Sequence, residues 1–282
     1  MGITPVPLLL TLLAPASFAQ WLQQADLGQL EQACSDPQIG ASDARRQQIR
    51  DRLLVLHPAP QAFELVLANA TALLRCGSPD SAAVVLQRVS PGTAEQRSRW
   101  LTVRWRAAAA GLDHRQAALA LRRLVDGDLA ALTDVELDPG VNALDQLAAH
   151  EAALGRQRVA ADVQLLAPAP TAQQLARAAA WLASSDPQRA DRLLEVAVEQ
   201  AAADQAWGLA VELLQQQLRQ QRAAGGDGER PRQRLESLTA RLDDRYGQWK
   251  LQGGDAVDPL LRSPREAGGH AAIGDSQDAP SP

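Results

Sequence analysis

Apolar residues in the middle of the chain repeat with the period of an amphipathic helix. Between residues 60 and 75 they stand three or four positions apart, at Phe63, Val66, Leu67, Ala70, Leu73 and Leu74. This spacing predicts one apolar stripe along a helix, and Gly77 follows it where a residue free to take a positive φ ends a helix. Ser78 and Pro79 then supply the N-cap and the first turn of a second helix. The pattern predicts two antiparallel helices joined by a short turn.

The same unit of two helices recurs along the chain. Further pairs are predicted between residues 21 and 56, around Gly111, around Gly155, around Pro187, and at 204–222 with 229–251. An acidic stretch at 126–138 interrupts the series. Because a single pair cannot bury its own apolar stripe, we expect each pair to pack on the next one.

The predicted fold class is therefore all-α, a right-handed α-solenoid of antiparallel helix pairs that spans residues 20–252. Hydrophobic residues make up 46% of the 282 residues but aromatic residues only 3%, so we expect a core of Ala, Leu and Val. The sparse aromatic and β-branched residues disfavour a substantial sheet. Residues 253–282 are rich in Gly, Pro, Ser and Asp and carry no apolar period, which predicts a disordered tail.

Small residues recur at the points where the helices of a pair should cross. They are Ala70, Gly77 and Ala82 with Leu86 in one pair, and Ala178, Ser185 and Ala190 with Leu194 in another. In these residues the chain resembles the tetratricopeptide-repeat (TPR) family, whose repeat of about 34 residues is a helix, a turn and a second helix. The aromatic residues that this family favours are largely missing, and the repeat lengths vary. The resemblance implies stacked pairs whose first helices line a concave, peptide-binding surface.

Residues 1–19 differ in character from the rest of the chain. An apolar run from Leu8 to Leu13 precedes Ser17 and Ala19, which together resemble the apolar core and cleavage site of a signal peptide. No Lys or Arg precedes the run. We expect cleavage before Gln20 and export to the periplasm or the extracellular space; the alternatives are a misassigned start or a disordered leader on a cytoplasmic protein. No run reaches the ~20 apolar residues needed to cross a bilayer, so we expect no integral membrane span.

Cys34 and Cys76 are the two cysteines of the chain. In an oxidising compartment they are able to form one disulfide between neighbouring helix pairs. The alternative is that both are small buried apolar side chains at the C-terminal ends of helices. A bridge requires Cα atoms within ~7 Å of each other, so the sequence leaves both possibilities open.

Charge and residue spacing argue against several kinds of chemistry. A net charge of -5 without a basic run argues against a nucleic-acid partner. The histidines lie far apart in the sequence, and the acidic stretch at 126–138 lacks the alternation and closing Glu of a calcium loop. Residues 225–228 lack the Lys and the Ser or Thr that follow a phosphate-binding glycine loop. We therefore predict no catalytic residue, no cofactor, no metal and no enzymatic activity.

Tryptophan accounts for six residues of the chain, a large share of its few aromatic side chains. Trp100, Arg104 and Trp105 form the cluster that predicts a partner-binding site, because indole rings near arginines anchor peptides. The alternative is that each Trp fills a gap in an Ala-rich core. We expect an exported helical-repeat protein that binds another protein or peptide as a scaffold or assembly factor. The alternative functions are an enzyme with a site in a groove between helices, and a purely structural helical bundle.

Overall fold

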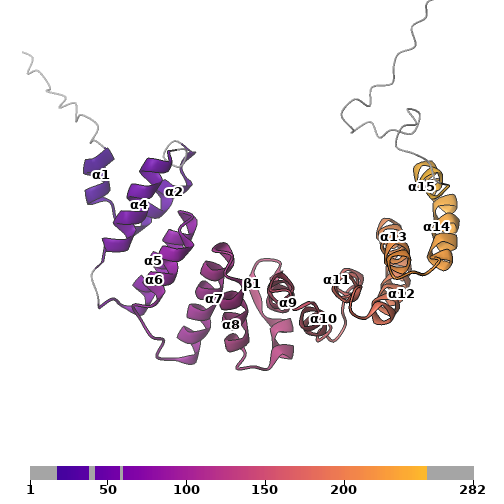
Figure 1. Cartoon of the computed structure of the whole chain (residues 1–282). Coiled ribbons are helices and arrows are strands. Elements are labelled where there is room, and N and C mark those ends of the chain that lie inside the picture. The colour runs from indigo at the N-terminus through magenta and orange to yellow at the C-terminus, as the bar shows by residue number, and fades with distance from the viewer. Residues whose placement is uncertain (1–17, 38–41, 58–59, 253–282) are drawn as a thin grey trace, which may run out of the picture. The chain divides into compact units, whose positions relative to one another are not determined.

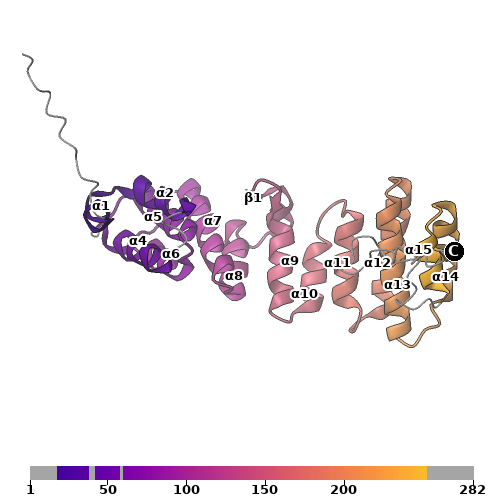
Figure 2. The same cartoon turned by 90° about the horizontal axis from the view of Figure 1, so that it is seen from above.

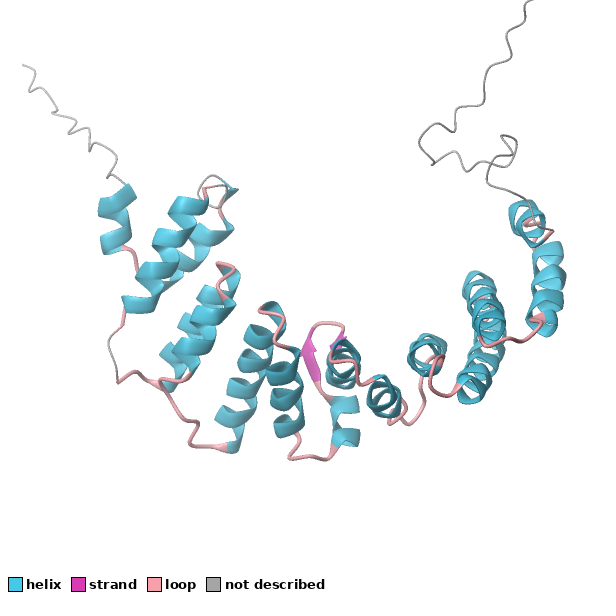
Figure 3. Cartoon of the chain, in the orientation of Figure 1, coloured by secondary structure: helices cyan, strands magenta, loops and turns pink. Residues whose placement is uncertain are grey.

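The computed structural model describes residues 18–37, 42–57 and 60–252. Within these ranges the chain is helical apart from one 3-10 turn and a two-stranded hairpin (Figure 3), which confirms the predicted all-α class. Most of the predicted leader and all of the predicted disordered tail lie outside the described residues. The chain divides into two compact units, Met1–Leu166 (unit 1) and Ala167–Pro282 (unit 2).

Unit 1 is a succession of short helices that follow one another in the chain (Figure 1). They are α1 (Phe18–Gln24), α2 (Leu27–Ser35), α4 (Asp43–Val55), α5 (Phe63–Arg75), α6 (Pro79–Leu86), α7 (Ala94–Ala110), α8 (His114–Leu124), α9 (Ala143–Ala153) and α10 (Gln157–Gln164). From α4 to α10 each helix packs against the next, and α5 also packs against α2 and α7. Packing within unit 1 therefore joins elements that are close in the sequence.

The turn between α5 and α6 has the conformation that the sequence predicts. Gly77 takes a φ of 70°, and the backbone N–H of Ser78 donates to the carbonyl of Leu73 at 2.9 Å. This bond satisfies one of the carbonyls left open at the end of α5. Pro79 then opens α6, where its missing N–H costs no hydrogen bond.

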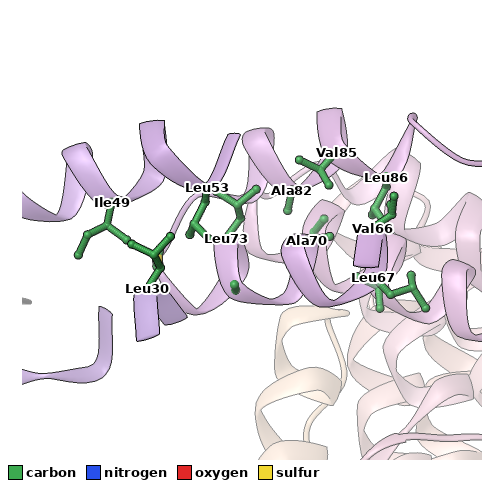
Figure 4. Close-up of a cluster of buried hydrophobic side chains, with 14 of the residues drawn as sticks. Leu30, Ile49, Leu53, Val66, Leu67, Ala70, Leu73, Ala82, Val85 and Leu86 are labelled. Atoms are coloured by element: carbon green, nitrogen blue, oxygen red, sulfur yellow. The ribbon is translucent and has the colours of Figure 1, made fainter. Parts of the chain in front are cut away.

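The core at the start of unit 1 is made of Leu, Ile, Val and Ala from α2, α4, α5 and α6 (Figure 4). Leu30, Ile49, Leu53 and Leu73 are all fully buried. Burial of one such side chain stabilises a fold by roughly 1.5–3 kcal/mol. The close approach of α5 and α6 depends on alanines, since Ala70 and Ala82 are also fully buried.

Side chains from α5 and from the turn after α6 satisfy two carbonyls at the C-terminal end of α4. The amide of Asn69 donates to the carbonyl of Leu53 at 3.0 Å, and the guanidinium of Arg88 donates to that of Leu54 at 2.8 Å. These groups would otherwise be buried without a partner. The register of α4 against α5 and α6 is thereby fixed by polar contacts as well as by the core.

The acidic interruption at 126–138 contains the 3-10 turn η1 (Leu129–Asp134) and the strand β1 (Glu136–Asp138). β1 pairs in antiparallel fashion with β2 (Val141–Asn142), directly before α9. The side chain of Asn142 accepts from the backbone N–H of Leu144 at 2.9 Å, so the hairpin ends in the N-cap of α9. The interruption thus leads the chain from α8 into α9.

Unit 2 contains five further described helices (Figure 2). They are α11 (Ala172–Leu182), α12 (Pro187–Ala203), α13 (Trp207–Ala223), α14 (Glu229–Arg241) and α15 (Arg245–Leu251). Each of these packs against the next along the chain. None of the helices that the structure describes is long and apolar enough to cross a lipid bilayer.

The predicted single helix at 229–251 is wrong, because the structure has α14 and α15 there. Asp243 lies between them with a φ of 51°, which ends α14. The side chain of Asp244 accepts from the backbone N–H of Gly247 at 2.9 Å and caps α15. Aspartate tolerates a positive φ better than most residues and is a favoured N-cap, so this pair of residues ends one helix and begins the next.

Candidate functional site

Trp100 and Arg104 line a small pocket on unit 1. The pocket lies between α6, α7 and α8 and has a volume of about 260 Å³. Asp80 and Ala83 of α6 form one wall, and Asp113, at the start of α8, contributes to another. Three neighbouring helices therefore bring an aromatic ring, an arginine and two carboxylates to one cavity.

The chain's own contacts hold Trp100 and Arg104 in place. The indole Nε1–H of Trp100 donates to the carbonyl of Leu86 at 3.0 Å, and the ring packs on the core of unit 1. The Arg104 guanidinium lies 5.0 Å from the centre of this ring and donates to Oε1 of Gln116 at 3.2 Å. Trp100 thus packs between α6 and α7, as the gap-filling interpretation predicts, and it also lines the pocket.

The charges around the pocket favour a positively charged ligand. Asp80 and Asp113 each carry a carboxylate, whereas Arg104 is the one cation among the lining residues. Asp113 uses one oxygen to accept from the backbone N–H of Gln116 at 3.0 Å. Both carboxylates lie at the start of a helix, where the helix dipole stabilises negative charge.

The structure does not bring Trp105 to this pocket. Trp105 is only 6% exposed, and its Nε1–H donates to Nε2 of His150 at 3.0 Å. Positions five apart on an α-helix point about 140° away from each other, so Trp105 faces α9 while Trp100 faces α6. Of the three predicted partner-binding residues, Trp100 and Arg104 share a site and Trp105 belongs to the core.

A pair of histidines, the half-buried His114 and the buried His150, lies beside Trp105, although their spacing in the sequence predicts no shared site. Nδ1 of His114 and Nδ1 of His150 lie 3.1 Å apart. The indole N–H can only donate, so Nε2 of His150 must accept; the proton of the neutral His150 ring is then on Nδ1 and donates to His114. This chain of two hydrogen bonds joins α7, α8 and α9. A signal was present in the sequence, because His150 falls on the apolar stripe of Leu144 and Leu147.

The surroundings of His150 disfavour the protonated form of its ring. Burial lowers the pKa of His150, His114 lowers this pKa further, and Glu151 acts in the opposite direction. Glu151 is 1% exposed and accepts from Arg122 at 2.9 Å and Arg156 at 3.2 Å. The junction of α8 with α9 therefore holds a His150 ring whose protonation is disfavoured, beside a carboxylate that is paired with two arginines.

The other arginines of α7 connect this helix to its neighbours and do not enter the pocket. Arg99 donates to both carboxylate oxygens of Glu64 on α5, at 2.7 and 2.6 Å. This pairing lowers the pKa of Glu64 and raises the pKa of Arg99. Arg106 pairs with Asp138 of β1. Arg97 pairs with Asp126, just after α8. All three of these arginines are already paired within unit 1, which leaves Arg104 as the arginine of this helix at the candidate site.

Cys34 and Cys76 form a disulfide in unit 1. Their Cα atoms lie 5.0 Å apart, inside the range that a bridge requires. Cys34 belongs to α2 and Cys76 is the C-cap of α5, so the bond joins two helices that also pack through the core. Of the two possibilities that the sequence leaves open, the structure has the bridge.

No protein-family model matches this chain, and no curated protein matches it either. Among the described residues, no three or more His, Cys, Asp or Glu side chains are grouped so that they could hold a metal ion. The pocket of Trp100 and Arg104 is therefore characterised by its own geometry and charge.

Proposed function

We propose that this protein binds a segment of another protein in the pocket of Trp100 and Arg104, as a scaffold or assembly factor and not as an enzyme. The observation that carries the proposal is the meeting of an aromatic ring and two carboxylates in one cavity of about 260 Å³. Aromatic residues in pockets of this kind dominate the energetics of protein interfaces. Contacts within unit 1 hold the ring, so little conformational entropy is lost when a partner binds.

The partner should present a basic side chain, Lys or Arg. Its apolar stem would lie along Trp100 and Ala83, and its charged head would lie near Asp80 and Asp113. Arg104 is already engaged with the indole ring and Gln116, so it leaves the two carboxylates to the ligand. Opposite charges in a partly enclosed site attract more strongly than on an open surface.

We also propose that the helix pairs form a TPR-like α-solenoid. Packing between neighbours along the chain within each unit supports this architecture. The small residues on which the resemblance depends support it as well, because Ala82, Ala178 and Ala190 are buried to 1% exposure or less. Such close helix crossings are typical of α-solenoids, whose repeats serve as binding surfaces.

Export to an oxidising compartment fits this proposal. The disulfide between Cys34 and Cys76 is of the kind that persists outside reducing compartments. The apolar run from Leu8 to Leu13 with the small residues after it is typical of a signal peptide. Mass spectrometry of the mature protein from its own host tests this, since export predicts an N-terminus at Gln20.

The binding proposal is tested by filling the pocket. Ala83→Trp places a large ring in the cavity, whereas Val84→Trp places the same ring on the next residue, which is 53% exposed and does not line it. Partners are first isolated with the wild-type chain and identified, and each is then purified and titrated against all three proteins. We expect Ala83→Trp to weaken binding at least about tenfold, the equivalent of ~1.4 kcal/mol, and Val84→Trp to leave it within about twofold.

Two further outcomes decide the proposal. Asp80→Lys should weaken the binding of the same partner, because it replaces an attractive charge with a repulsive one. A partner that binds wild type and Ala83→Trp equally would place its site elsewhere and overturn the proposal. Turnover of a small molecule by the purified chain, with no protein partner, would overturn it in favour of an enzyme.

A further inference from the structure

Unit 2 carries a second pocket whose charge is opposite to that of the first. It lies between α12, α13 and α14 and has a volume of about 430 Å³, within the ~300–1,000 Å³ range typical of ligand sites. Its floor is apolar, with buried Val198 and Leu214 and the half-buried ring of Trp207. The floor provides the apolar surface that a large side chain of a ligand would need.

Three arginines of α14 line this pocket, at Arg230, Arg234 and Arg241. They stand four and seven positions apart, so they project from one stripe of the helix. Arg230 and Arg234 donate to the same carboxylate oxygen of Glu195, at 2.6 and 2.8 Å. One negative charge thus faces three positive ones, which leaves a local excess of about two charges beside the apolar floor.

Arg241 is the least engaged of these arginines. Its guanidinium makes no ion pair with any residue that the structure describes, whereas Arg232 of the same helix, which does not line the pocket, pairs with Glu236 at 3.0 Å. The other oxygen of Glu195 accepts from Gln217 at 3.1 Å, so both oxygens of this carboxylate are already engaged. Arg241 is therefore the cation that remains open to an incoming carboxylate.

We propose that this pocket of unit 2 binds an acidic peptide segment that carries a large apolar side chain. The apolar side chain would lie against Trp207, Leu214 and Val198, and flanking Asp or Glu side chains would pair with Arg241 and Arg234. Arginine binds carboxylates through two parallel hydrogen bonds, which fixes the direction of the peptide. A nucleic acid fits less well, because its phosphates would leave the apolar floor uncovered. This inference depends on unit 2 alone and is independent of the pocket in unit 1.

The test titrates a fluorescein-labelled peptide, with four glutamates around a central Leu-Phe pair, into the full chain and follows fluorescence anisotropy. Two control peptides carry glutamine for glutamate, or serine for the Leu-Phe pair. We expect saturable binding of the first peptide and at least about tenfold weaker binding of both controls. Added salt should weaken the binding of the first peptide, since attraction between exposed charges is screened beyond ~10 Å at 0.1 M salt.

Variants of α14 assign the binding to the pocket. Arg241→Glu and the pocket-filling Ser237→Trp should each weaken binding of the acidic peptide at least about tenfold. Arg232→Glu makes the same charge change outside the pocket and should have an effect below about threefold. Circular dichroism checks that each variant keeps its helices, and Ala83→Trp in unit 1 should leave this peptide's binding unchanged.

Several results would overturn the inference. They are no saturable binding, equal weakening by Arg232→Glu and Arg241→Glu, and equal binding of the peptide without the Leu-Phe pair. Binding of the chain to vesicles with anionic lipids, lost in Arg241→Glu while the peptide fails to bind, would assign the same arginines to a membrane surface and also overturn it.

Discussion

The interactions that join the helices within unit 1 differ in kind from those that join the helices within unit 2. In unit 1 the Cys34–Cys76 disulfide joins α2 to α5, and the contact of His114 with His150 joins α8 to α9. The described part of unit 2 contains no cysteine and no histidine. Changes in redox state, and changes in pH near neutrality, should therefore act on unit 1 and leave the described helices of unit 2 unaffected.

Unit 2 has a polar cluster of its own, which is built around a glutamine and contains no histidine. Gln217 of α13 is buried, and its amide donates to Asp191 at 2.9 Å and to Glu195 at 3.1 Å, both on α12. The amide of Gln217 has no titratable proton. The helices of unit 1 are thus joined by a disulfide and a histidine pair, which respond to redox state and pH, whereas an amide that does not titrate joins α13 to α12 in unit 2.

The pockets of the two units also differ, in the charge of the side chains that line them. The pocket of unit 1 has two carboxylates around Trp100, and the pocket of unit 2 has three arginines beside Trp207. If each takes the ligand that its charge favours, the chain binds a basic side chain in one unit and an acidic peptide in the other. Conditions that loosen unit 1 would then release the first ligand and keep the second.

The largest expected effect comes from removal of the disulfide. The bond closes a loop with a sequence separation of 42, for which the chain-entropy account gives about 4 kcal/mol. In the double variant Cys34→Ala with Cys76→Ala, amide hydrogen exchange should speed up in α2, α4 and α5 and stay unchanged in α11 to α13. Equal acceleration in both units would break the comparison, because it would show that unit 2 depends on unit 1 for its stability.

The second effect comes from Trp105→Phe. This change removes the N–H that donates to His150 and leaves Nε2 of that ring buried without a donor, which costs about 1–3 kcal/mol. Trp181→Phe in α11 of unit 2 is the matched control, since Trp181 is half-buried and the described residues give it no such bond. We expect urea denaturation to show a larger loss for Trp105→Phe, and equal losses would remove any special role for the histidine pair.

The third effect is a pH dependence confined to unit 1. Burial and His114 hold the pKa of His150 below its ordinary value of 6.5, so the unfolded chain binds this proton more readily than the folded chain. The neutral form of His150 contributes fully to the free energy of unfolding above pH 6.5. This contribution is lost as the pH falls from 6.5 toward the pKa of His150 in the folded chain.

His150→Gln is the control for that pH dependence. It removes the titrating group and keeps an acceptor for the Trp105 N–H, with Arg122, Glu151 and Arg156 left in place. The unfolding free energy, followed by hydrogen exchange in α8 and α9, should fall on acidification in the wild type and change less in His150→Gln. A fall of the same size in α11 to α13 would contradict the assignment to His150.

Much of the fold could be predicted from the sequence, because helices signal their own ends. The stop at Gly77 and the start at Pro79 were readable from local chemistry and match α5 and α6. The break between α14 and α15 was missed because Asp243 takes a positive φ without being glycine. A residue of that kind carries a weaker local signal than Gly, and the apolar period continues across the break.

The candidate site was predicted only in part, for reasons of geometry between helices. Trp100 and Arg104 lie one turn apart on α7, so the sequence places them together. The walls formed by Asp80 and Asp113 come from two other helices, and no pattern within one helix announces that they converge. The pair of His114 and His150 is a long-range contact of the same kind, as was the pairing of the two cysteines.

The smallest expected effect tests what the two units share. Leu112 in unit 1 and Gln205 in unit 2 take φ values of 58° and 55°, in turns where the next N–H donates to a carbonyl five residues back, at 2.8 Å in both cases. Gly77 holds the corresponding place after α5. In a non-glycine residue this conformation lowers the free energy of unfolding by about 1–2 kcal/mol. A glycine avoids this strain but lowers the free energy of unfolding by about 0.4–1 kcal/mol, because it gives the unfolded chain more conformational freedom.

Leu112→Gly and Gln205→Gly should therefore each stabilise their own unit by roughly 0.5–1 kcal/mol, the net of these two effects. Leu112 is 74% exposed, so the loss of its side chain removes little burial, and Leu112→Ala is the control that leaves the strain in place. Thermal unfolding with hydrogen exchange in each unit measures the gain. Equal gains would show that the turns of both units obey the same local rule, so that the units differ only in what fastens their helices. A gain in one unit alone would mean that packing around the turn, and not backbone strain, sets its stability.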